Sequence, residues 1–255
     1  MSREINKISI IGSGNVAWHL SKHFAEANIE VSHITSRNKN TCIEICNKTD
    51  ATYVASVSDL PQNQLVIICT PDDSIASICE QVHYTCPVAY TSGSIDLSKL
   101  PKRQNLGVFY PLQTFSKCYD LDLKNVPFFI EATNEKFSQC LFALASQISS
   151  TVRSANSQER SELHLSAVFV NNFTNHIIHK AQEYAESKSI DFNYLLPLLN
   201  ETIRKLESDS AFNAQTGPAR RRDNSTIEQH KSKLKGISKE IYNLLSKSIK
   251  NTYHD

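Results

Sequence analysis

The fold is decided by the stretch Lys7-Ile-Ser-Ile-Ile-Gly-Ser-Gly-Asn-Val-Ala17, in which an apolar strand pattern ends in a glycine turn and helical spacing follows. Gly12 allows a sharp turn, Gly14 lets a pyrophosphate approach the backbone, and Ala17 is small enough for the helix to pack on the strand. The free N–H groups and the positive dipole end of that helix favour a diphosphate. The stretch therefore predicts a dinucleotide-binding turn rather than an ordinary strand–turn–helix, with these cofactor contacts: Gly12, Ser13, Gly14, Asn15 and Val16.

The end of the second predicted strand indicates which dinucleotide binds. Residues 30–37 end in Thr35, Ser36 and Arg37, with no acid. An NAD-selective site usually has Asp or Glu there to bond the ribose 2′-hydroxyl, whereas a guanidinium and a short hydroxyl suit a 2′-phosphate. We therefore expect NADP, held by Ser36 and Arg37; the alternative is that Arg37 is a solvated loop cation.

Composition excludes several classes of protein. The 255 residues allow one large domain or two modest ones. With 27 Lys and Arg against 26 Asp and Glu, no net field favours nucleic acid or an anionic membrane. No apolar run could span a bilayer, and no signal peptide precedes the first strand pattern. The seven cysteines show no metal-binding pattern, so we expect reduced thiols, no metal and a cytoplasmic location.

Strand and helix patterns alternate through the first half of the chain. Apolar runs typical of strands occur at residues 51–54, 65–69, 87–90, 106–109 and 126–130. Helical patterns lie between several of them, at residues 40–48, 75–82 and 135–148. This alternation predicts an α/β fold with a doubly wound parallel sheet.

Polar motifs follow successive strands of this predicted sheet, at residues 70–73, 91–94 and 110–113. In such sheets ligands bind beyond the carboxyl ends of the strands. We therefore expect substrate contact at Tyr110 and cofactor contacts near the nicotinamide at Thr70, Pro71, Asp72, Ser92 and Gly93. Each motif alone is also typical of a simple turn.

Strand patterns stop near residue 153, which predicts a sheet domain over residues 1–152 and a smaller all-helical domain over 153–255. Residues 159–185 read as one long helix, whose apolar middle at 167–170 indicates burial on all sides. His164, Asn171 and Asn175 fall within about 20° of one line on such a helix. Buried polar groups need partners, here either a substrate or a neighbouring loop.

The remaining residues predict further helices. Residues 191–206 form one that Pro197 interrupts or kinks. The last begins at a capping box formed by Ser225 and Glu228. Its apolar stripe, from Ile227 to Ile249, indicates a core or a dimer interface.

The motifs together resemble the Rossmann-type proteins that carry a C-terminal helical domain of unknown function and are commonly described as NADP oxidoreductases. The resemblance covers nearly the whole chain and rests on G-S-G-N-V-A at 12–17, T-P-D-D at 70–73, Y-T-S-G-S at 90–94, F-Y-P-L-Q-T-F at 109–115, H-L-S-A-V-F-V-N-N-F at 164–173 and G-P-A-R-R-R-D at 217–223. More distantly, the chain is similar to pyrroline-carboxylate reductase, prephenate dehydrogenase and the 6-phosphogluconate and β-hydroxyacid dehydrogenases. These likenesses imply a homodimer formed through the helical domain, and they imply that Arg221 and Asp223 line the cleft or brace the loop.

One departure from those relatives bears on the proton donor. The β-hydroxyacid dehydrogenases have H-x-x-K-x-x-x-N with a proton-donating Lys, whereas this chain has His164-x-x-Ala167-x-x-x-Asn171. The prephenate dehydrogenases have a His-Pro pair where this chain has Tyr110-Pro111. Alanine cannot transfer a proton, so His164, Tyr110 or Ser92 would take that role.

The leading hypothesis is an NADP-dependent oxidoreductase that transfers a hydride to or from a small carbonyl or imine substrate. We expect His164 as the acid–base group, Ser92 beside the reacting atoms, Asn171 on the substrate's polar group, and Asn175 as a further substrate contact. The missing Lys favours an alternative, an NADP-binding sensor or scaffold without redox turnover. A third hypothesis, hydride transfer to a deazaflavin, rests only on a common label of the family.

Overall fold

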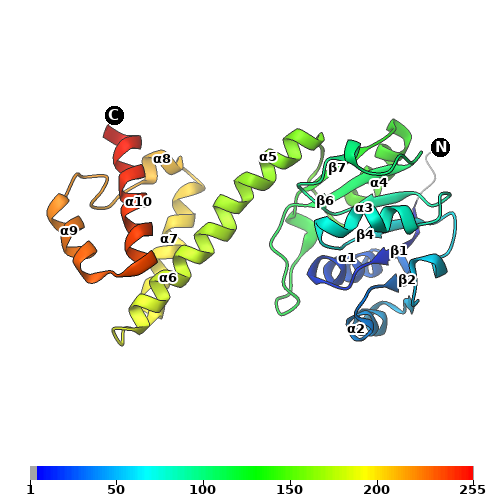
Figure 1. Ribbon diagram of the computed structural model, residues 1–255, viewed down its shortest axis with the longest axis horizontal. Helices are drawn as coiled ribbons and strands as arrows, with labels where there is room; N and C mark the ends of the chain where they lie inside the picture. The colour runs from blue at the N-terminus through cyan, green and yellow to red at the C-terminus, as the bar shows by residue number, and fades with distance from the viewer. Residues whose placement is uncertain (1–4, 255) are drawn as a thin grey trace. The chain divides into compact units, whose positions relative to one another are not determined.

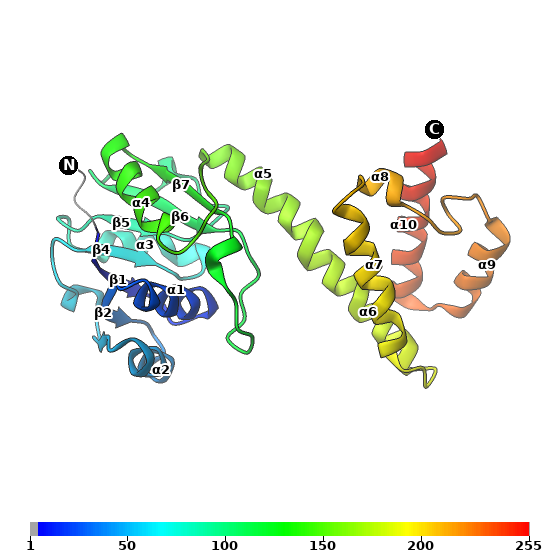
Figure 2. The same cartoon turned by 180° about the vertical axis from the view of Figure 1, so that it is seen from behind.

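The computed structural model describes residues 5–254. Contacts divide the chain into two compact units, one up to Asn172 and one from Phe173 onward (Figures 1 and 2). The domain boundary expected after residue 152 stays a prediction; the division by contacts falls later, because α5 (Ser157–Ala167) groups with the sheet.

The first unit contains a sheet of eight strands in the order β3-β2-β1-β4-β5-β6-β7-β8. Their bounds are β1 Lys7–Ile11, β2 Glu30–Thr35, β3 Thr52–Tyr53, β4 Leu65–Ile68, β5 Val88–Tyr90, β6 Leu106–Pro111, β7 Phe128–Ala132 and β8 Val152–Ser154. All neighbours pair in parallel except β6 and β7, which are antiparallel. The α/β fold expected from the sequence is confirmed, with this one antiparallel pair as the difference.

The antiparallel pair follows from the connection between β6 and β7. Parallel neighbours need a crossover, usually a helix, but residues 112–127 form a loop with only a short 3₁₀ turn at Leu123–Asn125. The backbone N–H of Leu112 donates to the carbonyl of Pro127 at 2.9 Å and joins the two ends of the loop. We call residues 112–127 the strap.

Helices cover both faces of the sheet and bury its apolar strands. The first unit's helices are α1 Asn15–Glu26, α2 Lys39–Thr49, α3 Asp72–Gln81, α4 Glu135–Ser146 and α5. One buried cluster joins α1, α2 and α4 to the sheet, and a second joins α3 to the opposite face. Strands β4 and β6 are buried along their whole length, as continuous apolar runs of a parallel sheet should be.

A π-helical segment, Val168–Phe173, follows α5 directly and leads into α6 (Thr174–Glu186). The long helix expected over 159–185 is therefore present, with a wider turn inside it. The expected burial of residues 167–170 is wrong for this chain by itself, because Phe169 is 62% exposed and Val170 is 76% exposed. The apolar composition of residues 167–170 predicts that they are buried, but it does not reveal whether the surface that buries them belongs to the same chain.

The second unit consists of helices joined by turns and loops, with no strand among its described residues. After a 3₁₀ turn at Phe192–Leu195, its further helices are α7 Leu196–Leu206, α8 Ala211–Ala214, α9 Asn224–Lys233 and α10 Gly236–His254. Pro197 lies in the first turn of α7, where it is tolerated, and so it does not kink a helix. No helix within residues 5–254 is long and apolar enough to cross a membrane.

The last helix expected from the sequence is two helices. Asp223 caps α9 and its carboxylate accepts the backbone N–H of Thr226 at 3.0 Å, so the expected capping box at Ser225 and Glu228 is wrong. The helical stripe is broken before α10, where Gly236 has a φ of 52°. Glycine adopts that left-handed conformation without the steric cost that other residues incur.

Candidate functional site

The turn between β1 and α1 leaves room for a ligand at the start of the helix. Gly12 has a φ of 120°, and a Cβ there would lie 2.3 Å from the carbonyl oxygen of Cys69. By contrast, a Cβ on Gly14 would meet nothing within 4 Å. Gly14 caps α1 with no side-chain hydrogen bond, so the first N–H groups of α1 are available to an anion. The residues present therefore fit a diphosphate.

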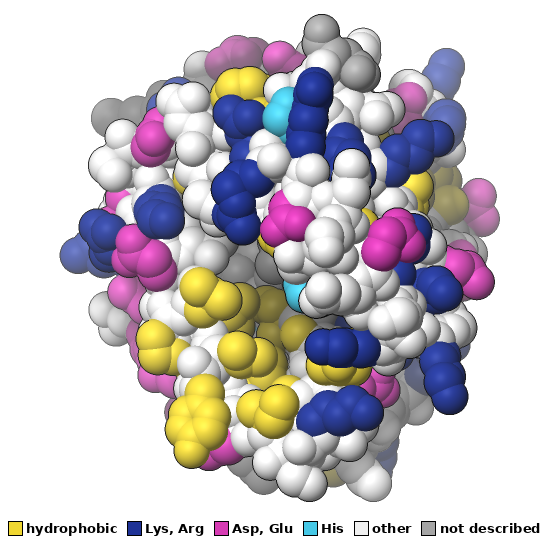
Figure 3. All heavy atoms as spheres, turned by 90° about the vertical axis from the view of Figure 1, so that its left-hand side faces the viewer, with side chains coloured by type: hydrophobic (Ala, Val, Ile, Leu, Met, Phe, Trp, Pro, Cys, Tyr) yellow, Lys and Arg dark blue, Asp and Glu magenta, His cyan; other side chains and the backbone are white. Residues whose placement is uncertain are grey.

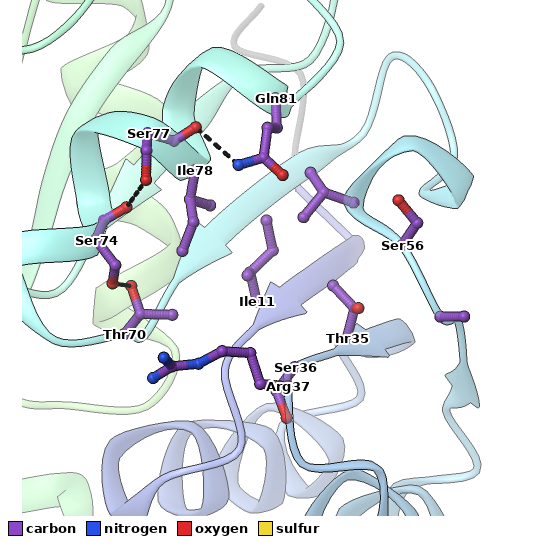
Figure 4. Close-up of a pocket in the computed structure, with 12 residues that line it drawn as sticks. Ile11, Thr35, Ser36, Arg37, Ser56, Thr70, Ser74, Ser77, Ile78 and Gln81 are labelled. Atoms are coloured by element: carbon purple, nitrogen blue, oxygen red, sulfur yellow. Dashed lines mark hydrogen bonds between the residues drawn. The ribbon is translucent and has the colours of Figure 1, made fainter.

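Beside this turn lies a pocket of about 440 Å³, beyond the carboxyl ends of β1, β2 and β4 (Figure 4). We call it the nucleotide pocket. It is lined by Ile11, Thr35, Ser36, Arg37, Ala55, Ser56, Val57, Thr70, Ser74, Ser77, Ile78 and Gln81. Figure 4 shows the Arg37 side chain extended toward Thr70, and within residues 5–254 this exposed cation forms no ion pair.

Hydroxyl groups tie the glycine turn to the end of β2. The Ser13 and Ser36 hydroxyl oxygens lie 2.7 Å apart, and the Ser36 hydroxyl donates to the carbonyl of Asn38 at 3.0 Å. Asn38 in turn caps α2, because its side chain accepts the N–H groups of residues 40 and 41. These bonds fix the backbone on both sides of Arg37.

The loops after β4 and β5 are linked to each other. Pro71 precedes the first turn of α3, and the hydroxyl of Ser94 donates to the carboxylate of Asp72. The Ser92 hydroxyl oxygen accepts the backbone N–H groups of Ser94 and Ile95, both at 3.1 Å. Ser92 thus shapes the turn, which is the structural role that its motif also allowed.

A second pocket, of about 540 Å³, lies at the carboxyl end of β6 and is formed by β6, the strap and the helix after β8. We call it the substrate pocket. It is lined by Tyr110, Leu112, Gln113, Thr114, Leu163, His164, Ser166, Ala167, Val168, Val170, Asn171 and Asn172. All of these residues belong to the first unit.

Tyr110 and His164 form the polar centre of the substrate pocket. The Tyr110 hydroxyl oxygen lies 3.1 Å from Nδ1 of His164. Burial raises the pKa of Tyr110, while the positive charge of Arg160 opposes this shift, so the phenol keeps its proton at neutral pH. Because a hydroxyl can donate or accept, Tyr110 can hold the imidazole in either protonation state.

Gly93 makes room for the Tyr110 ring. A Cβ on Gly93 would lie 2.6 Å from Cζ of Tyr110, which is closer than van der Waals contact allows. The turn after β5 therefore sets where the tyrosine ring lies.

The two pockets gather some of the residues expected from the sequence. Ser36, Arg37 and Thr70 line the nucleotide pocket, and Tyr110, His164 and Asn171 line the substrate pocket. Ser92 lines neither pocket, and its contact with substrate stays a prediction.

Three other expected substrate residues lie in the second unit: Asn175, Arg221 and Asp223. Asn175 is on α6 and Arg221 is in the turn before α9, and both are exposed. The carboxylate of Asp223 is occupied as the cap of α9, where hydrogen bonds from Thr226 lower its pKa. Their contact with substrate also stays a prediction.

The sequence analysis did not find how the strap is held. Three α1 side chains spaced four residues apart donate to strap carbonyls: Asn15 to Phe115 at 2.9 Å, His19 to Ser116 at 3.0 Å and His23 to Leu121 at 2.7 Å. The spacing of four residues between these polar side chains could have indicated their shared role, since such residues lie on one face of a helix. The side chain of Asn15 therefore holds the strap, and its backbone N–H is left available to a cofactor.

The sequence analysis also missed Arg160, whose side chain is fully buried and paired with Glu131. Nothing in its local pattern sets it apart from a surface arginine near the start of a helix. Among residues 5–254, no three or more His, Cys, Asp or Glu side chains are grouped so as to hold a metal ion.

Comparison with known families and structures gives consistent matches. Residues 7–87 match the family described as NADP oxidoreductase coenzyme F420-dependent, and residues 126–249 match a domain of unknown function, DUF2520. Comparison with curated proteins gives no match. The structure of a "putative NADP oxidoreductase" from Bacteroides fragilis is 34% identical, with a TM-score of 0.88 over 97% of this chain and 98% of that chain.

Two more distant structures share the fold. Pyrroline carboxylate reductase from Plasmodium falciparum, with NADP bound, is 11% identical, with a TM-score of 0.61 over 96% of this chain and 98% of that one. A variant imine reductase from Myxococcus stipitatus, in complex with NAD+, is 10% identical, with a TM-score of 0.59 over 97% and 95%. The similarity to pyrroline-carboxylate reductase expected from the sequence is confirmed at the level of the fold.

Proposed function

The chain belongs to the family of NADP oxidoreductases that join a Rossmann-type domain to the DUF2520 helical domain, and we propose that it transfers a hydride between NADP(H) and a small carbonyl or imine. The observation that carries the proposal is the Tyr110–His164 hydrogen bond. This pair lies in a pocket at the carboxyl edge of the sheet, the edge that also carries the glycine turn. The groups that we propose for binding and for proton transfer thus lie in one unit.

The glycine turn and the nucleotide pocket would hold the cofactor. Backbone N–H groups at the start of α1, in the segment Gly12–Val16, suit the diphosphate, and Ser36 and Arg37 suit a 2′-phosphate. No acidic side chain lines the nucleotide pocket, and Arg37 is exposed, which supports NADP over NAD. When bound, the nicotinamide supplies or accepts the hydride.

His164 handles the proton in this proposal. As an imidazolium it donates from Nδ1–H to the Tyr110 oxygen and gives the proton on Nε2 to the substrate oxygen or nitrogen. The neutral ring that remains still carries its Nδ1 proton, so Nδ1–H goes on donating to the Tyr110 oxygen and the ring keeps its orientation. The Asn171 amide, which lines the same pocket, holds the substrate's polar group.

Turnover tests this assignment. We expect the wild-type protein to oxidise NADPH with a cyclic imine or a small ketone, followed by absorbance at 340 nm. His164→Ala should lower kcat by about 10²–10⁴-fold, the usual contribution of general acid–base catalysis, with an unchanged NADPH Kd. The matched control is His83→Ala, which removes a histidine that bonds Thr85 at 2.9 Å within its own loop. An unaltered kcat in His164→Ala would refute the role of His164.

A second candidate function, an NADP-binding sensor or scaffold without turnover, is favoured by Ala167. This residue lines the substrate pocket at the position where related enzymes have a proton-donating Lys. Tight NADPH binding with no oxidation across imines, ketones and aldehydes would favour this second candidate.

Arg37 provides the test of cofactor choice. Arg37→Ala should weaken NADPH binding by about 10–100-fold, because hydrogen bonds to charged groups contribute roughly 1.5–3 kcal/mol, and should leave NADH binding unaltered. The control is Lys102→Ala, which removes an exposed cation from the loop before β6, at the other edge of the sheet. Equal losses for NADPH and NADH would remove the argument for NADP.

The second unit supports a homodimer. Figure 3 shows hydrophobic side chains gathered in one patch on the face that it displays. Its large exposed apolar residues include Ile177, Tyr194, Leu198, Ile203, Leu206, Phe212, Ile237, Leu244 and Leu245. So much apolar surface is typical of an interface, and a second copy is the partner we propose. Leu244→Glu should shift the mass measured by light scattering from dimer to monomer.

Cysteine chemistry supports a cytoplasmic location. Free thiols are present at Cys42, Cys46, Cys69, Cys79, Cys86 and Cys118, and burial raises the pKa of Cys69 to about 12. Scattered thiols of this kind are typical of a reducing compartment.

A further inference from the structure

Arg160 lies in the first turn of α5, and its side chain is 0% exposed. Its guanidinium donates to the carboxylate of Glu131, to the carbonyl of Ile95 and, at 3.4 Å, to the hydroxyl of Tyr90. Its Nε atom has no acceptor among the described residues. Burying a charge in this way is costly, so a salt bridge here needs a reason other than stability alone.

Two of the partners of Arg160, Tyr90 and Glu131, lie in one row across the sheet. Tyr90 of β5 pairs with Val108 of β6, and Val108 pairs with Glu131 of β7. Residues that pair in this way point to the same face of a sheet. Arg160 therefore fastens the start of α5 to the row that contains Val108.

The next row on that face contains Tyr110, two residues further along β6. Two residues of a strand span about 6.6 Å, and four residues of an α-helix rise about 6 Å. His164 lies four residues after Arg160 on α5, and its ring bonds Tyr110 of this next row at 3.1 Å.

Two neighbours hold the start of α5 in the same place. The Ser157 hydroxyl donates to both carboxylate oxygens of Glu131, at 2.9 and 3.1 Å, and accepts the backbone N–H of Leu97 at 3.1 Å. Asn156 and Glu159 form a capping box at the helix start. The helix therefore begins at one fixed point above β5 and β7.

We propose that Arg160 is a positioning residue for the reaction: by pairing with Glu131 it sets the register of α5 on β6 and so places His164 on Tyr110. This inference rests on the proposed function for its kinetic consequence, although the geometry can be measured without turnover. Arg160 lines neither pocket, so it acts on the site through the position of His164 and through its charge near Tyr110, without touching substrate or cofactor.

Arg160→Lys is the informative variant, because it keeps the charge and loses the planar fork that reaches Glu131, Ile95 and Tyr90 together. We expect kcat to fall about 10-fold or more, since a displacement of about 1 Å can cost ~10²-fold, while the NADPH Kd stays within about 2-fold. In a His164→Ala background the same change should cause no further loss, because the two residues act as one unit.

The matched control is Arg103→Lys. Arg103 also donates to several backbone carbonyls, those of Cys79, Val82, His83 and Cys86. It lies before β6, away from the substrate pocket. A general loss of stability would affect both variants, whereas lost positioning affects Arg160→Lys alone.

A readout without turnover separates this inference from the proposed function. In protein labelled with ¹⁵N-histidine, the ring nitrogen signals of His164, assigned with His164→Ala, report the hydrogen bond at Nδ1. They should shift in Arg160→Lys and stay in place in Arg103→Lys. If Arg160→Lys does not fold, Ser157→Ala tests the same register and should give a smaller shift of the same sign.

Unchanged His164 ring signals in folded Arg160→Lys would overturn the inference, whether or not a substrate is known. Equal losses of kcat in the wild-type and His164→Ala backgrounds would also overturn it. If no substrate is turned over but the ring signals shift as expected, the positioning role stands and the proposed function fails.

Discussion

The two pockets of the first unit are built in different ways. The nucleotide pocket lies beside the glycine turn and is formed by the ends of β1, β2 and β4, residues 55–57 and α3, with hydroxyl bonds between adjacent loops. The substrate pocket depends on Tyr110 and His164, which are 54 positions apart, and on a buried ion pair behind them. Local backbone geometry thus fixes the first pocket, and long-range packing fixes the second.

This difference predicts separable effects of mutation. Changes in the glycine turn should alter cofactor affinity, because that turn makes the shape into which a phosphate fits. Changes around Tyr110 should alter the catalytic rate and leave cofactor affinity intact.

The largest effect is expected for Gly12→Ala. A Cβ there would lie 2.3 Å from the Cys69 carbonyl oxygen, at a φ of 120°, and such strain costs on the order of 1–3 kcal/mol. Tm should fall by about 2–12 °C, since 1 kcal/mol shifts it by about 2–4 °C at this size, and NADPH binding should be lost. Differential scanning calorimetry and fluorescence titration measure the two effects. If the Tm of Gly12→Ala equalled that of the wild type, the backbone of the turn would have relaxed around the added methyl group. Local backbone geometry would then not be what fixes this pocket.

Gly14→Ala should weaken binding and leave folding intact. The added Cβ would meet no protein atom within 4 Å, so Tm should be that of the wild type. The methyl group would occupy space that a phosphate needs, and misfit of this size costs about 1–3 kcal/mol, or roughly 5–150-fold in the NADPH Kd. An unchanged Kd would indicate that the diphosphate does not approach the backbone at this turn.

The sequence predicted the nucleotide pocket and most of the sheet because their signals are local. Strand, glycine turn and helix follow one another within residues 7–26, and continuous apolar runs such as Leu65–Ile68 mark buried strands. The antiparallel β7 and the short β8 were not foreseen. The direction of β7 depends on the strap, whose fastening to α1 involves side chains about 100 residues away.

The substrate pocket was only partly predictable, and the long helix shows why. The line through His164, Asn171 and Asn175 assumes 100° per residue throughout, but residues 168–173 form a π-helical segment. Its hydrogen bonds span five residues instead of four, so positions after it are out of phase with those before it. No local sequence pattern marks Arg160, because its burial beside Glu131 arises only once α5 and the sheet have come together.

Gly93→Ala should have a moderate effect confined to the substrate pocket. Its Cβ would lie 2.6 Å from Cζ of Tyr110 and would displace the ring from His164. We expect kcat to fall about 10-fold with an unchanged NADPH Kd, because overpacking of this kind costs roughly 1–3 kcal/mol. Steady-state kinetics measure kcat, and fluorescence titration measures the NADPH Kd. An effect on Kd alone would mean that this turn serves the cofactor, and the division between the pockets would fail.

The smallest expected effect concerns alkaline pH. Burial raises the pKa of Tyr110 above its ordinary value near 10, so the folded protein keeps the phenolic proton at a pH where the unfolded chain has lost it. Stability then decreases as pH rises from the unfolded pKa toward the folded one. Tyr110→Phe removes the ionisable group, and the fall in Tm between pH 8 and pH 10.5 should be smaller than in the wild type.

Tyr84→Phe is the control for this alkaline effect, because Tyr84 is 82% exposed and its removal should leave the pH dependence of Tm as it is. Both variants lose one hydroxyl, so a difference between them in the pH dependence of Tm reports the effect of burying the Tyr110 phenol in the substrate pocket. The same result should hold with NADPH bound, because the nucleotide pocket contains no tyrosine. If Tyr110→Phe and Tyr84→Phe give the same dependence, then the Tyr110 phenol ionises as freely as an exposed one. The close packing on which the Tyr110–His164 pair depends would then be absent in solution.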